Sequence, residues 1–361
     1  MAEALNKMMK FIDKANAHLK KKHKADTLYL ASECGDFLPL PSGFPTIDWV
    51  NSGIGGYPRG GMTLVHGLES TGKSTMLLEC IRHNQGTDAE FTAMYIDVES
   101  ALTKQFLSFK GIDPSRVALT PLNACEDVLT VAKDAIYENV FDLIVIDSLA
   151  KLDSEKILEK DIGEAAQRNR RAVLITEFLR SISFTLRKSK TALVCINQEV
   201  QNQDPSPYAP KTILPCGMQQ KYSANLRLEI KRTKSIKDGD IKVGYQMDAT
   251  SKKNKISDKE NAKTKLTYLF DRGFVKAISV VDFLMAIGVV KKMSAGRFEF
   301  AKKELCSDVF KPKDILDIVN NIRINFGIDL LNVKPSEVSY EKEERNDGDD
   351  DLSTDTMESE A

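Results

Sequence analysis

The stretch Gly67-Leu68-Glu69-Ser70-Thr71-Gly72-Lys73-Ser74-Thr75 decides how the rest of the sequence is interpreted. It fits the pattern G-x-x-x-x-G-K-[ST], a loop whose backbone N–H groups surround nucleotide phosphates. Residues 62–66 before it have the pattern of a short buried strand, and residues 75–81 after it have helical apolar spacing. Because a helix N-terminus that carries a lysine attracts anions, the stretch predicts binding of ATP or a close relative. The Ser74 hydroxyl is then placed to hold Mg²⁺.

Composition limits the class of protein. The 361 residues are 42% hydrophobic, which is ordinary for a globular protein, and no run of about 18 apolar residues predicts a membrane span. The six cysteines form no CxxC pair, so we expect reduced thiols in a cytoplasmic protein without a membrane partner. They are Cys34, Cys80, Cys125, Cys195, Cys216 and Cys306.

The order of apolar segments predicts an α/β fold, with a mostly parallel twisted sheet flanked by helices. Strands are expected at 62–66, 92–96, 117–119, 143–146, 192–196, 225–230 and 244–250, and helices at 1–24, 73–84, 101–110, 124–138, 171–187 and 280–287. Four parts follow: an N-terminal helix and linker at 1–40, the main domain at 41–274, a small α+β domain at 275–340 and a disordered tail at 341–361.

Charge is divided unevenly along the chain. Residues 341–361 hold ten acidic and two basic residues, so the remaining chain has a formal charge of +7 although the whole has −1. A basic body with an acidic tail suggests a polyanionic partner that the tail competes with. A tail that only improves solubility explains the pattern equally well.

Three apolar segments end in polar residues that chemistry could use. Asp147 ends the segment 141–147, and we expect its strand to lie beside the phosphate loop so that Asp147 holds Mg²⁺ with Ser74. Asp97 and Glu99 follow another strand and, from two-residue alternation, point the same way. Either acid could polarise the water that attacks the γ-phosphate. The pair Asn197-Gln198 ends a third strand, as a phosphate sensor or as a structural hydrogen-bonding pair.

Two loops are candidates for contact with a polyanion. The loop at 199–216 is long and rich in proline around Tyr208, and Lys211 adds a charge to it. The loop at 153–171 carries Arg168, Arg170 and Arg171, which suit contact with a phosphate backbone. A solvated basic surface is the alternative for the arginine cluster.

The ordered series of motifs resembles the RecA-type recombinases, in their bacterial and phage forms. The resemblance covers residues 41–300 and rests on the phosphate loop with its internal Glu-Ser and on five further motifs. These are Ile96-Asp97-Val98-Glu99-Ser100-Ala101-Leu102, Val145-Ile146-Asp147-Ser148, Asp161-Ile162-Gly163-Glu164, Ile196-Asn197-Gln198 and Lys253-Asn254-Lys255.

The resemblance implies roles for single residues. Glu99 matches the glutamate that activates water, and Gln198 matches the glutamine that couples the γ-phosphate to the second DNA-binding loop. Lys253 and Lys255 match lysines that reach the ATP of a neighbouring subunit. The loops at 155–171 and 199–216 match the two DNA-binding loops, Tyr222 lies near an interface aromatic, and the helix at 1–24 matches one that docks on the adjacent subunit. At the adenine, Thr103 and Phe106 replace an Asp and a Tyr.

The resemblance also implies an activity. We expect an ATP- and Mg²⁺-dependent protein that forms a helical filament of its own copies on single-stranded DNA, exchanges strands with double-stranded DNA and hydrolyses ATP. A single-strand binding protein and a loading mediator are further expected partners. The alternatives are a ring-forming helicase motor of the same ATPase class and a mediator that binds ATP without hydrolysing it.

Overall fold

The computed structural model describes residues 2–23, 30–33, 35–152, 164–202, 206, 208–326 and 330–331. The chain divides into two compact units, Met1–Val280 and Val281–Ala361. Three predictions concern residues outside the described ones, namely the acidic tail, the thiol of Cys34 and most of the first basic loop. The domain limits drawn from the sequence stay predictions.

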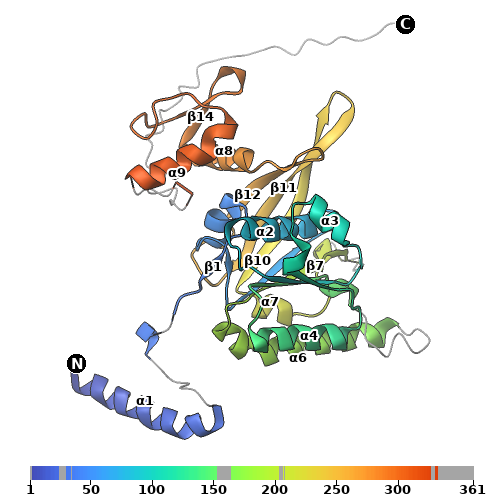
Figure 1. The fold of residues 1–361 in the computed structure, drawn as a ribbon, viewed down its shortest axis with the longest axis vertical. Helices are drawn as coiled ribbons and strands as arrows, with labels where there is room; N and C mark the ends of the chain where they lie inside the picture. Colours follow the sequence, from blue (N-terminus) through green and yellow to red (C-terminus); the bar gives the residue numbers. More distant parts are fainter. Residues whose placement is uncertain are drawn as a thin grey trace. The chain divides into compact units, whose positions relative to one another are not determined.

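A nine-stranded sheet forms the centre of the first unit (Figure 1). Its neighbouring strands are, in order, β13 (Gly273–Phe274), β12 (Lys263–Leu269), β11 (Ile241–Asn254), β10 (Leu226–Asp238), β3 (Met62–Gly67), β7 (Ala192–Gln198), β6 (Leu143–Asp147), β4 (Ala93–Asp97) and β5 (Val117–Thr120). The strands from β10 to β5 are parallel, and those from β10 to β13 are antiparallel. The predicted α/β fold with a mostly parallel sheet is confirmed.

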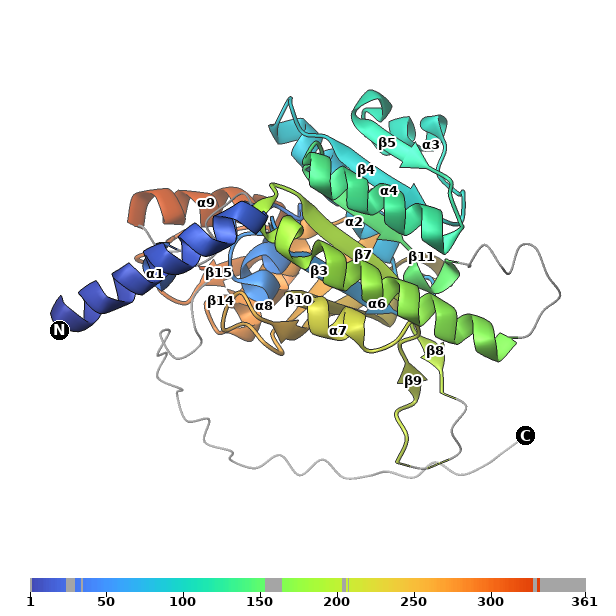
Figure 2. The ribbon, with the colours of Figure 1, turned by 90° about the horizontal axis from the view of Figure 1, so that it is seen from below.

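Helices cover both faces of this sheet (Figures 1 and 2). Helix α2 (Lys73–Thr87) packs on the face that contains Val65, whereas α4 (Cys125–Glu138) and α6 (Glu164–Lys188) pack on the face that contains Leu64. Successive residues of a strand point to opposite faces, so these continuous apolar strands fill two cores at once. This burial fixes the carboxyl ends of the parallel strands at one edge.

An N-terminal helix and several short elements complete the first unit. They are α1 (Ala2–His23), η1 (Ala31–Glu33), β1 (Pro39–Leu40), the π-helix η2 (Ile47–Ser52), β2 (Tyr57–Pro58), α3 (Lys104–Phe109), η3 (Pro114–Arg116), η4 (Leu149–Lys151), β8 (Val200–Gln201), β9 (Thr212–Ile213) and α7 (Gln219–Ser223). The cysteines among the described residues are free, and four of the five are buried. Burial raises the pKa of the Cys195 thiol to about 12, in keeping with the expected unreactive core thiols.

The hairpin of β10 and β11 is much longer than the sequence predicted. Apolar alternation ends near Ile230, but β10 continues to Asp238, and the segment 231–235 is exposed. Antiparallel bonding with β11 supports this extension, because backbone hydrogen bonds need no apolar side chains. The hairpin projects past the rest of the sheet in Figure 1.

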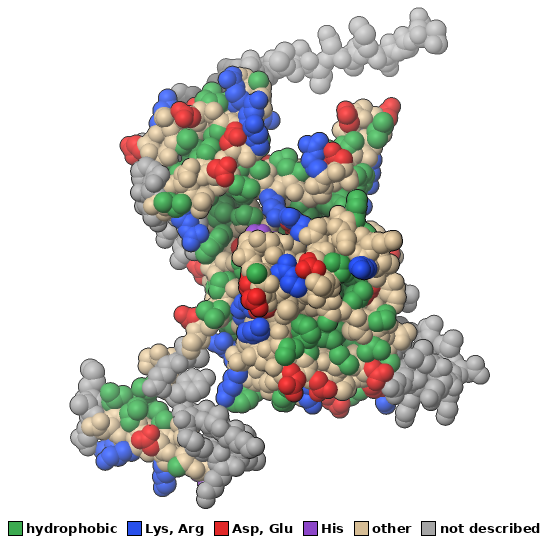
Figure 3. Space-filling model, in the orientation of Figure 1, with side chains coloured by type: hydrophobic (Ala, Val, Ile, Leu, Met, Phe, Trp, Pro, Cys, Tyr) green, Lys and Arg blue, Asp and Glu red, His purple; other side chains and the backbone are tan. Residues whose placement is uncertain are grey.

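Helix α1 has one strongly apolar side that is largely exposed. Leu5, Met8 and Phe11 are 49%, 45% and 65% exposed, and apolar and basic side chains both occur along this helix in Figure 3. An exposed apolar stripe on a helix favours packing against another surface. No described helix is long and apolar enough to cross a membrane.

The second unit is small and mixed. Its strands β14 (Val290–Lys292) and β15 (Phe298–Phe300) pair antiparallel, and its helix α9 (Ile315–Phe326) adds Val319 and Ile322 to the buried residues. Helix α8 (Lys276–Ala286) spans the boundary between the units, and η5 (Ser294–Gly296) and η6 (Pro312–Asp314) are single turns.

Candidate functional site

The phosphate loop joins β3 to α2, as the sequence predicted. A Cβ atom at Gly67 would lie 2.1 Å from the carbonyl oxygen of Ile230 in β10, so only glycine fits there. Gly72, just before α2, has a left-handed backbone with φ of 87°, and Ser70 is left-handed as well at 56°. The guanidinium of Arg232, which sequence reasoning missed, donates to the Ser70 carbonyl. The loop is therefore held by β10 from outside.

Lys73 lies inside this loop. Its ammonium donates to the carbonyl oxygens of Leu68 at 2.7 Å and Gly67 at 3.1 Å, and the side chain is almost buried. Burial lowers the pKa of Lys73, while the negative charges of Asp147 and Glu199 oppose that shift. A cation held by neutral carbonyls in a partly dry loop is a strong site for a phosphate oxygen.

Ser74 and Asp147 lie together, although the predicted strand neighbours were wrong. Strand β7 lies between β3 and β6, and the first turn of α2 brings the Ser74 hydroxyl to the Asp147 carboxylate instead. The Tyr95 hydroxyl also donates to Asp147, at 2.6 Å. Burial raises the pKa of Asp147, and the two hydrogen bonds oppose this shift. A hydroxyl beside a buried carboxylate suits Mg²⁺, which favours oxygen ligands.

The two-residue alternation assumed for Asp97 and Glu99 does not extend to Glu99, although both carboxylates lie near Asp147. Strand β4 ends at Asp97, and the chain turns at residues 98–99, so two-residue alternation stops there. The buried Asp97 carboxylate accepts the Leu102 backbone N–H at 2.6 Å. The Glu99 side chain is 52% exposed and lies 3.9 Å from the Lys151 ammonium. The Glu99 carboxylate is therefore accessible to a substrate, whereas the Asp97 carboxylate is already bonded to the backbone.

The amide pair at the end of β7 has two different environments. Asn197 is fully buried and donates to Pro215 at 3.0 Å and to Gln220 at 2.7 Å. Gln198 is partly exposed and lies directly opposite Gly67 in the parallel register of β7 and β3. The structural alternative therefore fits Asn197, and Gln198 stays the predicted sensor.

A cavity of about 450 Å³ opens beside the end of the phosphate loop. Thr75 lines it together with Phe109, Lys110 and aromatic residues that sequence reasoning missed, Tyr268 and Phe270. Neither Thr103 nor Phe106 lines this cavity: the Thr103 hydroxyl accepts the Phe106 N–H and caps α3. The aromatic pair in the sequence Tyr268-Leu269-Phe270 was the available signal.

Lys253 and Lys255 lie at the opposite end of the sheet from the phosphate loop. In the strand register, Lys253 of β11 lies opposite Arg227 of β10, which in turn lies opposite Leu64 of β3. The Lys255 N–H donates to the Asn225 carbonyl. The Asn225 N–H donates to Met62, at the start of β3. Met62 precedes Gly67 by five residues, about 17 Å along the strand, and Leu64 precedes it by three residues, about 10 Å.

The environment of Lys253 is unusual for a lysine. Its ammonium donates to the carbonyls of Lys221 at 2.6 Å and Tyr222 at 2.8 Å. Burial lowers its pKa to about 8, and the charges of Lys255 and Arg227 add to this shift. Within the described part of the chain, no carboxylate lies within ion-pair distance of Lys253 or Lys255. These two positive charges remain available to another molecule.

The arginines of the first basic loop are mostly bound within the protein. Arg170 pairs with Glu126 of α4 at 3.1 Å, and Arg171 donates to the carbonyls of Ala150 at 2.6 Å and Leu152 at 2.9 Å. The segment 153–163 and the side chain of Arg168 lie outside the described residues. Arg171 therefore anchors the C-terminal end of this loop, which favours a positioning role for it over direct contact.

The second loop rises from the carboxyl end of β7 as a short ladder of β8 and β9 (Figure 2). Tyr208, beyond this ladder, is 95% exposed, and Lys211 is exposed as well. Exposed aromatic and basic side chains on one loop suit stacking on bases and contact with phosphates.

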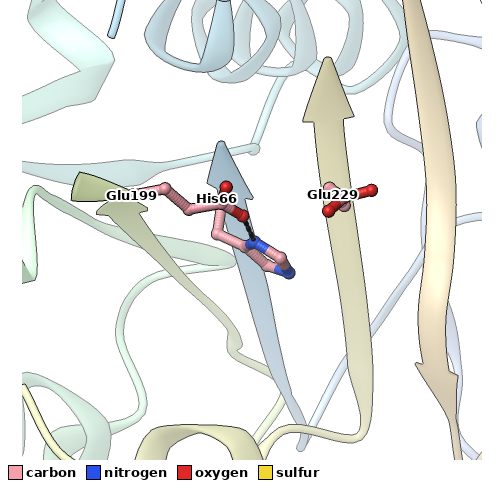
Figure 4. A group of neighbouring side chains, drawn as sticks. All are labelled: His66, Glu199 and Glu229. Carbon is pink, nitrogen blue, oxygen red and sulfur yellow. Dashed lines mark hydrogen bonds and ion pairs between the residues drawn. The ribbon is translucent and has the colours of Figure 1, made fainter. Parts of the chain in front are cut away.

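A cluster of His66, Glu199 and Glu229 lies under this loop (Figure 4). One ligand atom from each falls within 4.8 Å of the others, a geometry that metal ions can use, and His66 Nε2 has no partner among the described residues. Lys231 at 3.1 Å and Lys252 at 3.4 Å, however, already pair with Glu229. Because these cations balance the acids, the cluster needs no metal.

Comparison with known proteins bears on the whole arrangement. The family model described as the RecA N-terminal domain matches residues 3–275. The chain belongs to the RecA family. Curated relatives include Protein RecA of Aquifex pyrophilus, 28% identical over 307 residues, which are 84% of this chain and 86% of that protein. Protein RecA of Bacillus pumilus (strain SAFR-032) is 29% identical over 312 residues, 84% of this chain and 88% of that protein.

The resemblance to RecA-type recombinases drawn from the motifs is thus confirmed. The expectations of ATP binding, DNA binding and a part in DNA recombination and repair follow from membership of the RecA family. The roles of single residues stay predictions, and the geometry above is what supports them.

Proposed function

We propose that this protein is an ATP-dependent recombinase that forms helical filaments on single-stranded DNA and catalyses homologous pairing and strand exchange. Hydrolysis of ATP is Mg²⁺-dependent and is stimulated by DNA. One observation carries the proposal: the phosphate loop and the lysines expected to complete its site lie at opposite ends of the sheet. A second copy of the chain must therefore supply the lysines.

At the phosphate edge each residue has one role. Lys73 binds phosphate oxygens, and Ser74 and Asp147 would hold Mg²⁺, which would supply positive charge to the transferring phosphoryl group. Glu99 accepts a proton from the attacking water, which its exposure permits. Gln198, next to Gly67, senses the γ-phosphate.

Assembly follows from the position of the lysine pair. Lys253 and Lys255 of one copy reach the ATP of the next and stabilise transition-state charge, as an arginine finger does. Contact between unlike surfaces repeats from copy to copy and gives an open helix when the rotation does not close. The exposed apolar stripe of α1, with Leu5, Met8 and Phe11, supports docking on an adjacent copy.

DNA binding is assigned to the two loops. Tyr208 and Lys211 contact single-stranded DNA directly, and Arg168 and Arg170 add phosphate contacts that weaken as salt rises. Strand exchange uses double-stranded DNA as the second partner. A single-strand binding protein and a loading mediator complete the proposed set of partners.

Electron microscopy with ATP, Mg²⁺ and single-stranded DNA tests this function directly. We expect helical filaments, and a strand-exchange assay should give product with the same mixture. Closed hexamers without filaments would instead support the ring-forming helicase motor. Protein that binds ATP but hydrolyses none with DNA and Mg²⁺, and in which Glu99→Gln changes nothing, would support the non-hydrolysing mediator.

A further inference from the structure

We propose that Glu199 ties the base of the second loop to the phosphate loop, with His66 as the residue that positions its carboxylate. This inference rests on the proposed function, because it treats the loop at 199–216 as the DNA-binding loop. It adds to Gln198 a second connection, in which His66, Glu199 and Thr212 lie outside the motifs found in the sequence.

The first contact is through the backbone. The Glu199 N–H donates to the carbonyl oxygen of Gly67 at 3.0 Å. The ammonium of Lys73 donates to the same oxygen at 3.1 Å. One carbonyl of the phosphate loop is therefore shared between the lysine that binds phosphate and the first residue of the second loop.

The second contact is through the side chain. Glu199 Oε1 accepts from His66 Nδ1 at 2.7 Å, and Glu199 Oε2 accepts from the Thr212 hydroxyl at 2.9 Å. His66 precedes Gly67 at the end of β3, and Thr212 lies in β9. One carboxylate thus joins the strand before the phosphate loop to the returning arm of the second loop. Figure 4 shows the first of these contacts, between His66 and Glu199.

Burial makes these contacts firm. The side chains of His66 and Glu199 are each 8% exposed, so water competes little for their hydrogen bonds. The hydrogen bonds from His66 and Thr212 hold the pKa of Glu199 below its usual value, so it stays ionised at neutral pH. Thr212 also lies opposite Gln201 in the β8–β9 ladder, which extends the connection along the loop.

The expected consequence follows from the shared Gly67 carbonyl. When Lys73 binds a phosphate oxygen, its hydrogen bonds to the loop carbonyls change, and Gly67 and His66 adjust with them. Glu199 transmits this adjustment to Thr212 and so to the part of the loop that bears Tyr208. Binding of nucleotide and ordering of the loop are then coupled, and the coupling is reciprocal.

The test uses the full-length protein and four variants, one of which is Glu199→Gln. Thr212→Val removes the hydroxyl and keeps the shape, Thr212→Ser keeps the hydroxyl, and Thr130→Val removes an exposed hydroxyl that bonds only within α4. For each, we would measure affinity for a nonhydrolysable ATP analogue, hydrogen exchange of residues 200–216, and affinity for single-stranded DNA with and without the analogue.

We expect each threonine variant to bind the analogue within about twofold of the wild type, because Thr212 does not line the phosphate loop. The analogue should slow exchange in 200–216 and raise DNA affinity in the wild type, Thr212→Ser and Thr130→Val. In Thr212→Val the gain in DNA affinity should shrink by about tenfold, within the usual range of coupling between sites. Glu199→Gln should reduce the gain in the same direction, because it removes the charge that both donors contact.

Full retention of the analogue-dependent gain and of the slowed exchange in Thr212→Val would overturn the inference. The inference would also be overturned if the bound analogue did not change hydrogen exchange in residues 200–216 of the wild type. Nucleotide binding, the first element of the proposed function, would still stand in that case. A wild-type protein that binds neither analogue nor DNA would overturn both proposals together.

Discussion

At the carboxyl end of the parallel strands, Lys73 and Asp147 are bonded to side chains and loop carbonyls within the molecule, whereas at the amino end Lys253 and Lys255 have no acid within ion-pair distance among the described residues. Lys73 has three internal acceptors and Asp147 has two hydroxyl donors. Lys253 has only backbone carbonyls, and Lys255 is exposed. Under the proposed function, the first arrangement binds a nucleotide, and the second offers charge to a nucleotide that another copy binds.

This contrast suits two different tasks at the two ends of one sheet, namely binding a nucleotide and supplying charge to a nucleotide bound by another copy. A buried, internally bonded cation is positioned before its ligand arrives, which favours tight binding. A lysine whose pKa lies near 8 is only partly charged at slightly alkaline pH, and an incoming anion would restore its charge. Nucleotide binding at the carboxyl end and completion of the site by lysines from the amino end can therefore be tested with separate variants.

The largest effect is expected from the phosphate loop itself. Lys73→Ala should remove measurable ATP binding, and with it filament extension, because no other described lysine or arginine lies within the loop. Isothermal titration with ATP and Mg²⁺ measures this, with Lys104→Ala on exposed α3 as the matched control. Full strand exchange by Lys73→Ala would contradict the role given to this end of the sheet.

The next effect concerns the amino end. The double variant Lys253→Ala, Lys255→Ala should hydrolyse ATP about 10³-fold more slowly in the presence of DNA, as the loss of an arginine finger does. Its affinity for ATP as a dilute monomer should stay within about twofold. Mixing it with Lys73→Ala should restore part of the hydrolysis, because each then supplies what the other lacks. A dilute monomer with weakened ATP affinity would mean that the lysines act within their own subunit.

The acid pair provides a smaller, sharper test within the carboxyl end. Glu99→Gln should slow hydrolysis by about 10² or more and leave ATP binding intact, as expected for loss of a general base. Asp97→Asn should instead lower the free energy of unfolding by about 1–3 kcal/mol, because it weakens the buried hydrogen bond that the Leu102 N–H donates to this side chain. Thermal unfolding and turnover assays on both variants distinguish a catalytic from a structural role. Slow hydrolysis in Asp97→Asn together with lower stability in Glu99→Gln would mean that Asp97 is the base and Glu99 the structural residue.

The pH dependence of hydrolysis should report on Lys253. Its lowered pKa of about 8 means that its positive charge is present below pH 8 and is lost as pH rises through that value. DNA-stimulated hydrolysis should therefore fall about fivefold between pH 8 and pH 9, in proportion to the protonated fraction. Lys253→Arg should keep a flat profile over this range, since arginine stays charged. A wild-type hydrolysis rate that stays constant up to pH 9 would show that the charge of Lys253 does not affect hydrolysis.

The smallest effect is expected from the tail. Deleting residues 341–361 should raise affinity for duplex DNA several-fold at low salt and much less at high salt, because exposed charges are screened. Gel-shift titration at two salt concentrations measures this. Equal affinity of both proteins at low salt would make the tail a solubility device.

Local patterns predicted the phosphate loop, the parallel strands and the carboxyl-edge acids, because loop glycines and apolar runs act over a few residues. What depends on strand order could not be predicted. The position of β7 between β3 and β6 results from long-range packing, and the turn after Asp97 ended the alternation assumed for Glu99. The cavity aromatics Tyr268 and Phe270 lie at the end of an antiparallel strand, β12, and directly after it, far along the chain, and no spacing rule links them to Thr75.

The separation between Gly67 and the pair Lys253 and Lys255 also gives an assembly direction. Copies joined through this pair form a row with unlike ends, one showing an uncompleted phosphate loop and the other showing unused lysines. Under the proposed function, the terminal copy at the first end would hold nucleotide but lack the charges that speed its hydrolysis, so it would keep its nucleotide longest. Subunit loss should then be slow at that end and should begin elsewhere in the row, which gives growth and shrinkage a polarity set by a single protomer.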